Sequence, residues 1–222
     1  KELPIIIYED ESIIVVEKPS GMPSVPGLDG RISLLEWLKI RSRCNQNSIE
    51  SVHRLDMDTS GVMLFAKTPE AAINLRCQFE DHTIQKTYMA RICPDNIADL
   101  ERISDSGAVD LPLSPDYDER PRQKVDFQHG KDAYTKYEIA RINPDGTSDI
   151  LMYPETGRTH QLRVHCAHPL GLGCPIIGDR LYGSSSIYYC KDTRLHLHAL
   201  SITFHHPGNR KEMTFSSRTL SF

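Results

Sequence analysis

The stretch HRLDMDTSG at residues 53–61 runs directly into the apolar segment VMLFA at residues 62–66. A short continuous apolar run that follows turn residues predicts a buried strand. The polar stretch in front of it then forms the loop that enters this strand. Two roles fit that loop: a solvated surface loop with Asx-type turns, or a functional loop placed by a rigid strand.

Further strands and helices are predicted on both sides of this segment. Two β-branched runs, residues 5–8 and 13–16, flank three acidic residues and predict a hairpin. Other strands are predicted at residues 86–92, 133–142, 148–153, 194–204 and 212–215, and helices at residues 33–43, 69–82 and 157–167. The first two helices carry start signals, a Ser33/Glu36 capping box and a Thr68 cap. The excess of strands and the hairpin spacings predict an α+β fold, with a mixed, mostly antiparallel central sheet and flanking helices and loops.

The composition is that of an ordinary globular protein. The chain has 222 residues, 39% hydrophobic and 25% charged, which predicts a single domain over residues 1–222, built as one or two lobes. No apolar run approaches the roughly 18 residues of a membrane span, and no signal-peptide pattern opens the chain. We therefore expect no membrane partner.

The cysteines indicate a reducing environment. None of the six forms a C-x-x-C pair, so we expect free thiols and a cytoplasmic protein, with Cys77 as a small buried residue. The most ligand-like cluster is His165, Cys166, His168 and Cys174. No pair in it has a zinc-site spacing, so we expect no metal. A metal-dependent hydrolase is the alternative that this cluster would support.

The turn at residues 58–61, DTSG, resembles an aspartic protease motif, but the sequence excludes that class of enzyme. Aspartic proteases need two carboxylates that share a proton, each on an Asp-Thr-Gly or Asp-Ser-Gly turn. Here an extra residue separates Thr59 from Gly61, and the chain has no second copy.

A second polar stretch, ETGRTHQLRVH, covers residues 155–165. In a helix, Arg158, Leu162 and His165 would share one face, with Thr159 and Arg163 on the neighbouring stripe. No acidic residue follows the first position. The stretch is therefore either a basic solvated helix face, or a set of cations that need a phosphate or a buried carboxylate.

Together the two polar stretches resemble the RluA family of RNA pseudouridine synthases. Three further segments match motifs of that family in order: KPSGM at residues 18–22, KTYMA at residues 86–90, and PIIGD at residues 175–179 followed by LYG at 181–183. The resemblance extends from about residue 13 to residue 204. It implies an enzyme that isomerises uridine to pseudouridine within RNA, without cofactor or metal, on an α+β fold with a cleft across its sheet.

The resemblance also implies catalytic roles for three residues. Asp56 matches the catalytic aspartate, which can act as a nucleophile at C1′ or as a base at C2′. Arg163 matches the arginine that pairs with this aspartate and keeps it ionised. Tyr88 matches the tyrosine that stacks on the target base. Asp58 falls in a variable position of the motif, and we assign it no catalytic role.

The resemblance also points to residues that bind the substrate. A base in folded RNA must be flipped out of its stack to reach an active site. Arg54 matches the arginine that fills the vacated space, and Leu197 resembles the apolar residue beneath the flipped base. Arg158, His160 and His165 contact phosphate or shape the cleft, and structural support is an equal alternative for all three.

The expected partner is RNA, although the net charge is −4. Residues 95–119 contain eight acidic residues and one basic residue, so we expect this segment to lie away from the RNA. The cations that follow, at residues 120, 122, 124 and 131, form one side of an RNA groove or a solvated basic loop. We expect ribosomal RNA rather than transfer RNA as the main substrate, a monomer, and no S4-like domain. The alternatives are transfer RNA as the main substrate, and a non-catalytic RNA-binding module of the same fold.

Overall fold

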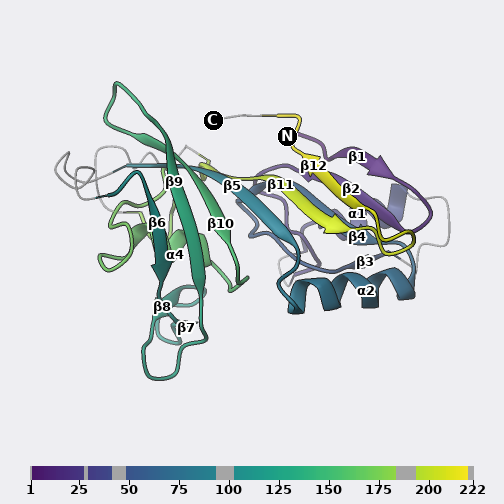
Figure 1. Cartoon of the computed structure of the whole chain (residues 1–222), viewed down its shortest axis with the longest axis horizontal. Helices are drawn as coiled ribbons and strands as arrows, with labels where there is room; N and C mark the ends of the chain where they lie inside the picture. The colour runs from purple at the N-terminus through teal and green to yellow at the C-terminus, as the bar shows by residue number, and fades with distance from the viewer. Residues whose placement is uncertain (1, 28–29, 42–48, 94–102, 184–193, 220–222) are drawn as a thin grey trace. The chain divides into compact units, whose positions relative to one another are not determined.

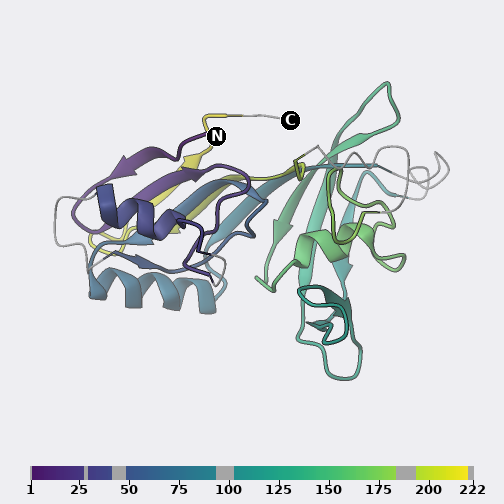
Figure 2. The same ribbon diagram turned by 180° about the vertical axis from the view of Figure 1, so that it is seen from behind.

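The computed structural model describes residues 2–27, 30–41, 49–93, 103–183 and 194–219. They divide into two compact units, shown in Figures 1 and 2. The first unit comprises residues 1–86 and 198–221, and the second comprises residues 87–197. The chain passes from the first unit to the second within β5 (Gln85–Ile92) and returns at the start of β11 (Leu197–His205).

The first unit contains a mixed sheet. Its strands pair in the order β1-β2-β4-β11-β12, and the short β3 also pairs with β4. All of these pairings are antiparallel except the one between β4 and β11, which is parallel. The strands are β1 (Ile5–Glu9), β2 (Ile13–Lys18), β3 (Glu50–Ser51), β4 (Ser60–Ala66), β11 and β12 (Glu212–Ser216).

Two helices in this unit begin at the predicted signals. In α1 (Leu34–Arg41), the Ser33 amide donates to the Glu36 carboxylate at 2.9 Å, and the Glu36 amide donates to Ser33 Oγ at 3.2 Å. The predicted capping box is therefore confirmed. In α2 (Pro69–Glu80), Thr68 Oγ1 accepts a hydrogen bond from the backbone amide of Ala71, in the first turn of the helix. The buried face of α2 packs on β4 in one apolar cluster, which includes Ala72, Leu75, Val62, Leu64 and Ala66.

The second unit contains an antiparallel sheet in the order β5-β10-β9-β6, and a separate β7–β8 hairpin. The elements are β6 (Ser106–Asp110), β7 (Leu113–Pro115), β8 (Gln123–Val125), β9 (Tyr134–Ile142), β10 (Ser148–Pro154) and α4 (Gln161–Ala167). Helix α4 lies behind β9 and β10 in Figure 1 and in front of them in Figure 2, so it covers one face of this sheet. Leu162 and Cys166 of α4 belong to the same apolar cluster as Ile150 and Met152 of β10.

The predicted fold class is confirmed, but two local predictions were wrong. The helix predicted over residues 157–167 begins only at Gln161, because His160 adopts a left-handed backbone conformation with φ 54°. The Gln161 side chain also accepts hydrogen bonds from the Arg158 amide at 2.9 Å and from Thr156 Oγ1 at 2.8 Å, and so stabilises a loop before the helix. Residues 158–160 therefore do not share a helix face with residues 162–165. Cys77, predicted to be buried, is exposed.

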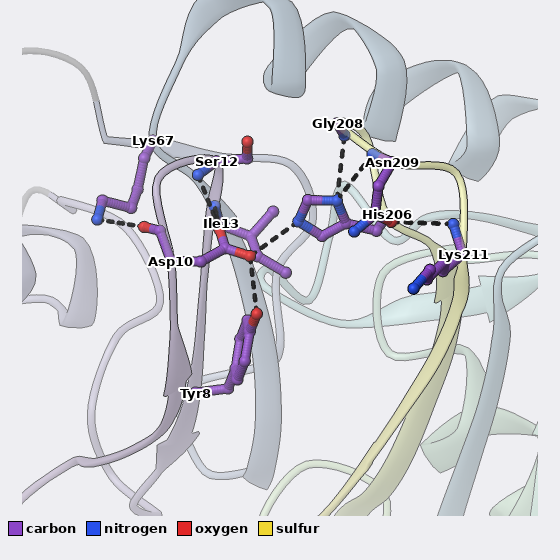
Figure 3. Close-up of polar contacts among 9 residues, drawn as sticks. All are labelled: Tyr8, Asp10, Ser12, Ile13, Lys67, His206, Gly208, Asn209 and Lys211. Atoms are coloured by element: carbon purple, nitrogen blue, oxygen red, sulfur yellow. Dashed lines mark hydrogen bonds and ion pairs between the residues drawn. The ribbon is translucent and has the colours of Figure 1, made fainter.

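A charged hydrogen-bond hub joins two turns of the first unit (Figure 3). Asp10 follows β1, and its Oδ1 accepts from the backbone amides of Ser12 at 2.8 Å and Ile13 at 2.9 Å. Its Oδ2 accepts from the Tyr8 hydroxyl and from His206 Nε2, both at 2.9 Å. Burial raises the pKa of Asp10, but the two amides and these side chains outweigh burial and hold that pKa below its usual value.

His206 lies in the turn between β11 and β12. Its Nδ1 accepts from the backbone amides of Gly208 at 3.1 Å and Asn209 at 3.2 Å. Because Nδ1 is an acceptor, the ring proton lies on Nε2 and is donated to Asp10. The hub thus connects the β1–β2 turn to the β11–β12 turn, which are far apart in sequence.

We expect Asp10→Ala to lower the free energy of unfolding by roughly 1–3 kcal/mol at pH 7, because four donors lose a charged acceptor. Because the folded pKa of Asp10 is depressed, its contribution is present above the unfolded pKa of about 3.9 and disappears as the pH falls through the folded pKa. Urea unfolding at pH 7 and pH 3 measures this difference. Glu11→Ala, in the same turn, is the control and should change stability by less than about 0.5 kcal/mol. Equal losses for Asp10→Ala and Glu11→Ala at pH 7 would contradict the role of the hub.

Candidate active site

The loop that carries Asp56 enters β4 in the first unit. The Thr59 amide donates to the Asp56 carbonyl oxygen at 3.1 Å, which closes a turn between Asp56 and the strand. Asp56 and Asp58 are both half-buried, whereas Arg54 is exposed. The predicted catalytic aspartate therefore lies on a closed turn immediately before a fully buried strand.

Lys18 lies at the end of β2, and its completely buried side chain binds this loop. Its ammonium donates to the carbonyl oxygens of Pro19 at 3.0 Å, Met22 at 2.8 Å and Met57 at 2.8 Å. Burial lowers the pKa of Lys18 to about 7, against the opposing effect of the Asp58 and Asp56 carboxylates. Lys18 thus connects the KPSG segment to the residue that follows Asp56.

Two serines hold the backbone on either side of Asp56. Ser24 Oγ donates to the Leu55 carbonyl oxygen at 2.6 Å and accepts from the Leu55 amide at 3.1 Å. Ser20 Oγ donates to the Asp58 carbonyl oxygen at 2.7 Å. Because both neighbouring peptide units are fixed, the Asp56 carboxylate is carried by a rigid backbone, as a preorganised catalytic group requires.

Gly61 is required where the loop becomes strand β4. Its φ is +115°, and a Cβ atom there would lie 2.2 Å from the carbonyl oxygen of Ala199 on β11. In the same register Ser60 pairs with His198, and Ser60 Oγ lies 2.8 Å from His198 Nδ1. The glycine of the motif is therefore explained by the close approach of the parallel strands β4 and β11.

His53 and Arg54 have opposite environments although they are adjacent. His53 Nε2 accepts from the Leu64 amide at 3.0 Å, and its ring stacks on Phe79 with centroids 4.8 Å apart. Burial, together with the charge of Lys86, lowers the pKa of His53 to about 3, so the ring is neutral. His53 supports the fold of the loop, whereas Arg54 is exposed and accessible to a ligand.

Arg163 is fixed by a buried carboxylate in the second unit. Its Nε lies 2.8 Å from Asp179 Oδ2, and a terminal nitrogen lies 2.7 Å from Oδ1. Asp179 Oδ1 also accepts from the amides of Leu181 at 2.9 Å and Tyr182 at 3.0 Å. The bidentate pair therefore holds the Arg163 guanidinium in one orientation.

Asp179 was not singled out by sequence reasoning. The alternatives for the cations of residues 155–165 included a buried carboxylate, and PIIGD supplies one at its last position. The pairing of Arg163 with Asp56 would join the two units and stays a prediction.

Tyr88 and Leu197 belong to the apolar part of the second unit. Tyr88 is half-buried on β5, opposite Met152 of β10, and it packs against the main apolar cluster of this unit. Leu197 is a buried member of that cluster. Both side chains therefore have the apolar surroundings that a stacked base requires, while their contact with a base stays a prediction.

Arg158 and His160 make protein contacts in the loop before α4. Arg158 Nε donates to the Asp132 carbonyl oxygen at 2.9 Å. His160 Nδ1 lies 2.8 Å from the Tyr182 hydroxyl, with the two rings edge to face. These contacts support the alternative of structural support, and a role in phosphate binding stays a prediction for both residues.

His165 is a core residue of α4. Its Nδ1 lies 3.0 Å from Thr135 Oγ1 and its Nε2 lies 3.2 Å from the Leu111 carbonyl oxygen. Burial lowers the pKa of His165 to about 4, so the ring is neutral. In the part of the chain that the structure describes, no group of three or more His, Cys, Asp or Glu side chains is placed to hold a metal ion.

The predicted site residues fall into two groups. Arg54 and Asp56 belong to the first unit, and Tyr88, Arg158, His160, Arg163 and Leu197 belong to the second. Within the second unit the Tyr182 side chain contacts both His160 and Arg163, whose guanidinium lies 5.2 Å from the ring centroid. Lys18 and Asp179, which bind the Asp56 loop and Arg163, had no role among the predictions from sequence.

Comparison with known proteins identifies the family. Residues 12–168 match the model of the RNA pseudouridylate synthase family, and these residues include Asp56, Tyr88 and Arg163. The chain belongs to this family. It is 42% identical over 212 residues to the dual-specificity RNA pseudouridine synthase RluA of Salmonella typhimurium, covering 95% of this chain and 91% of that protein. It is 42% identical over 215 residues to the protein of the same name from Escherichia coli K12, covering 96% and 92%.

Solved structures show the same fold. The human RNA pseudouridylate synthase domain containing 1 superposes with a TM-score of 0.77 at 24% identity, covering 98% of this chain and 84% of that one. The domain containing 4 gives a TM-score of 0.74 at 22% identity, covering 96% and 88%. The predicted resemblance and fold class are thus confirmed. In the described residues, no helix is both long and apolar enough to span a bilayer.

We expect Arg163→Lys to lower activity by about tenfold or more, because lysine cannot form the two-pronged pair with Asp179. The change should also lower the free energy of unfolding by about 1–3 kcal/mol, since one carboxylate oxygen loses its donor. Tritium release from 5-³H-uridine RNA and urea unfolding measure the two effects. Arg141→Lys, an exposed arginine of β9, is the control and should change neither. Wild-type turnover by Arg163→Lys would contradict the role of the fixed guanidinium.

Proposed function

We propose that this chain isomerises uridine to pseudouridine in structured RNA, with Asp56, Tyr88 and Arg163 as the catalytic residues. The observation that carries the proposal is the fixed Asp56 loop: backbone groups at Leu55, Met57 and Asp58 are held by Ser24, Lys18 and Ser20. This loop lies inside the segment that matches the family model. A carboxylate on a rigid turn is suited to react at a sugar carbon that must be placed accurately.

The reaction requires the N1–C1′ bond to break, the uracil to rotate, and C5 to join C1′. C5 then loses its hydrogen as a proton, the hydrogen that the tritium assay follows, and N1 gains a proton. The Asp56 carboxylate attacks C1′ as a nucleophile, or it removes a proton at C2′ to open a glycal route. Both routes use ionised Asp56, and a guanidinium can pair with such a carboxylate. We assign this pairing to Arg163, and the stacking of the detached uracil to the Tyr88 ring. The reaction as proposed needs no cofactor and no metal.

We propose that four further residues bind the substrate. The target base must leave its stack, at a cost of a few kcal/mol that a protein group has to offset. Arg54 is exposed next to the Asp56 loop, and its planar guanidinium can stack in the vacated position. Leu197 packs under the flipped base, and Arg158 and His160 contact the RNA backbone or shape the cleft.

We expect loss of turnover in Asp56→Asn with folding and RNA binding retained, because an amide of the same shape is neither a nucleophile nor a base. Tritium release from 5-³H-uridine RNA should fall by about 10³-fold or more. Asp58→Asn is the matched control, two residues further in the same turn, and should stay within a few fold of the wild type. Normal release by Asp56→Asn would refute the assignment. Absence of release from the wild type on both ribosomal and transfer RNA would favour the non-catalytic alternative.

We propose ribosomal RNA as the main substrate and transfer RNA as a second one. The relatives of this chain are named dual-specificity enzymes, which supports activity on more than one RNA. We expect kcat/KM in the tritium assay to be higher for ribosomal RNA transcripts than for transfer RNA transcripts. The opposite order would assign transfer RNA as the main substrate. We further propose a cytoplasmic monomer.

A further inference from the structure

An exposed aromatic ring with a cation above it lies in the loop between β7 and β8. Tyr117 is 69% exposed, and the Arg120 guanidinium carbon lies 5.1 Å from its ring centroid. Phe127, in the loop after β8, is equally exposed at 67%, and among the described residues it has no such cation over its ring. The surface of this unit thus offers two exposed aromatic rings, of which one carries a guanidinium.

The Tyr117 loop is closed by its own backbone. The Asp116 amide donates to the Arg122 carbonyl oxygen at 2.9 Å, and the Arg122 amide donates to the Glu119 carbonyl oxygen at 2.9 Å. Arg122 also forms an ion pair with the Glu119 carboxylate. Because these bonds fix the loop, the Tyr117 ring is presented to solvent from an ordered support.

The same loop is joined to residues of the candidate site in its own unit. The Gln123 amide donates to the Tyr182 hydroxyl at 2.7 Å, and the Arg122 guanidinium lies 5.5 Å from the Tyr182 ring centroid. Tyr182 in turn contacts Arg163 and His160. The Tyr117–Arg120 pair is therefore connected through Tyr182 to two residues proposed to act on the substrate.

We propose that Tyr117 and Arg120 form a stacking subsite for an unpaired nucleotide of the RNA other than the target uridine. This inference rests on the proposed function, because it takes RNA as the ligand. A tyrosine face accepts any base, and base stacking on aromatic side chains contributes about 1–3 kcal/mol per base. Arginine adds a cation over the same stack. The subsite therefore adds affinity with little dependence on base identity.

The charges around the subsite indicate stacking rather than ionic attraction. Asp116, Asp118 and Glu119 offset Arg120 and Arg122 within the loop, and the Glu119 carboxylate is occupied by Arg122. Contacts with phosphate would make affinity strongly salt-dependent, whereas stacking does not release counterions. The inference also changes one expectation from sequence: residues 117–119 belong to the acidic segment expected away from RNA, and the structure points to a contact there.

The test uses a fluorescein-labelled oligouridylate of about ten nucleotides, a length within the range of single-strand sites, and measures anisotropy at several salt concentrations. We expect Tyr117→Ala to weaken binding about tenfold with an unchanged salt slope, and Arg120→Ala to weaken it several fold. Tyr117→Phe keeps the stacking face and should bind within twofold of the wild type. Phe127→Ala is the matched control and should also bind within twofold. Circular dichroism checks that each variant is folded.

Unchanged affinity of Tyr117→Ala for the oligouridylate would overturn the subsite. The ring would then have another role, such as contact with a protein partner. Equal weakening by Phe127→Ala would also overturn it, because the effect would then belong to any exposed ring. Turnover separates this inference from the proposed function. Tyr117→Ala should raise KM for ribosomal RNA about tenfold and leave kcat within twofold. Tyr117-dependent binding without tritium release by the wild type would sustain the subsite and refute the enzymatic function.

Discussion

The buried ammonium of Lys18 is the interaction on which the first unit of this protein depends. An ammonium without a water shell is tolerated in a protein interior only when its donors are satisfied. Lys18 meets this condition with three carbonyl oxygens, from Pro19, Met22 and Met57. Two of them belong to the loop after β2, and the third belongs to the loop before β4. The need to satisfy the donors of one buried lysine side chain therefore folds both loops together.

In the second unit too, a buried charged group has its hydrogen-bonding partners satisfied, but here the buried group is an acceptor. The buried carboxylate of Asp179 takes two donors from Arg163 and two from backbone amides. A buried ion pair adds little net stability, since its desolvation offsets most of the attraction. Its geometry is nevertheless specific, because a planar guanidinium fits a carboxylate in one way. Each unit thus places one charged group of the proposed reaction through a completely buried partner.

The sequence pattern correctly predicted those strands and helices that neighbouring residues determine, through apolar runs and capping side chains. The run at residues 62–66 defines β4, and side chains at Ser33 and Thr68 start the two helices. The short strands β3, β6, β7 and β8 were not predicted. The five residues of β6 are mostly exposed, so only pairing with β9 makes them a strand, and no pattern within them shows that pairing. The start of α4 was misplaced because the Gln161 side chain stabilises a competing loop.

For the site, the resemblance supplied residue identities and the structure supplied their supports. Asp56, Tyr88 and Arg163 were identified from motifs that span most of the chain. The partner of Arg163 lies 16 residues further along the chain, beyond the reach of helical or strand periodicity. Lys18 was noted in the sequence only as the first residue of the KPSGM motif. Its role depends on a contact 39 residues away, which becomes visible only when the two loops meet in space.

The parallel pairing of β4 with β11 has a consequence for synthesis on the ribosome. Ser60 and its partner His198 are 138 residues apart, and at translation rates of about 5–20 residues per second the later strand emerges about 7–28 seconds after the earlier one. During that time the start of β4, next to the Asp56 turn, has an unpaired edge that any other strand could occupy. The nascent chain therefore cannot complete the backbone pairing beside the Asp56 turn until His198 and Ala199 have been made.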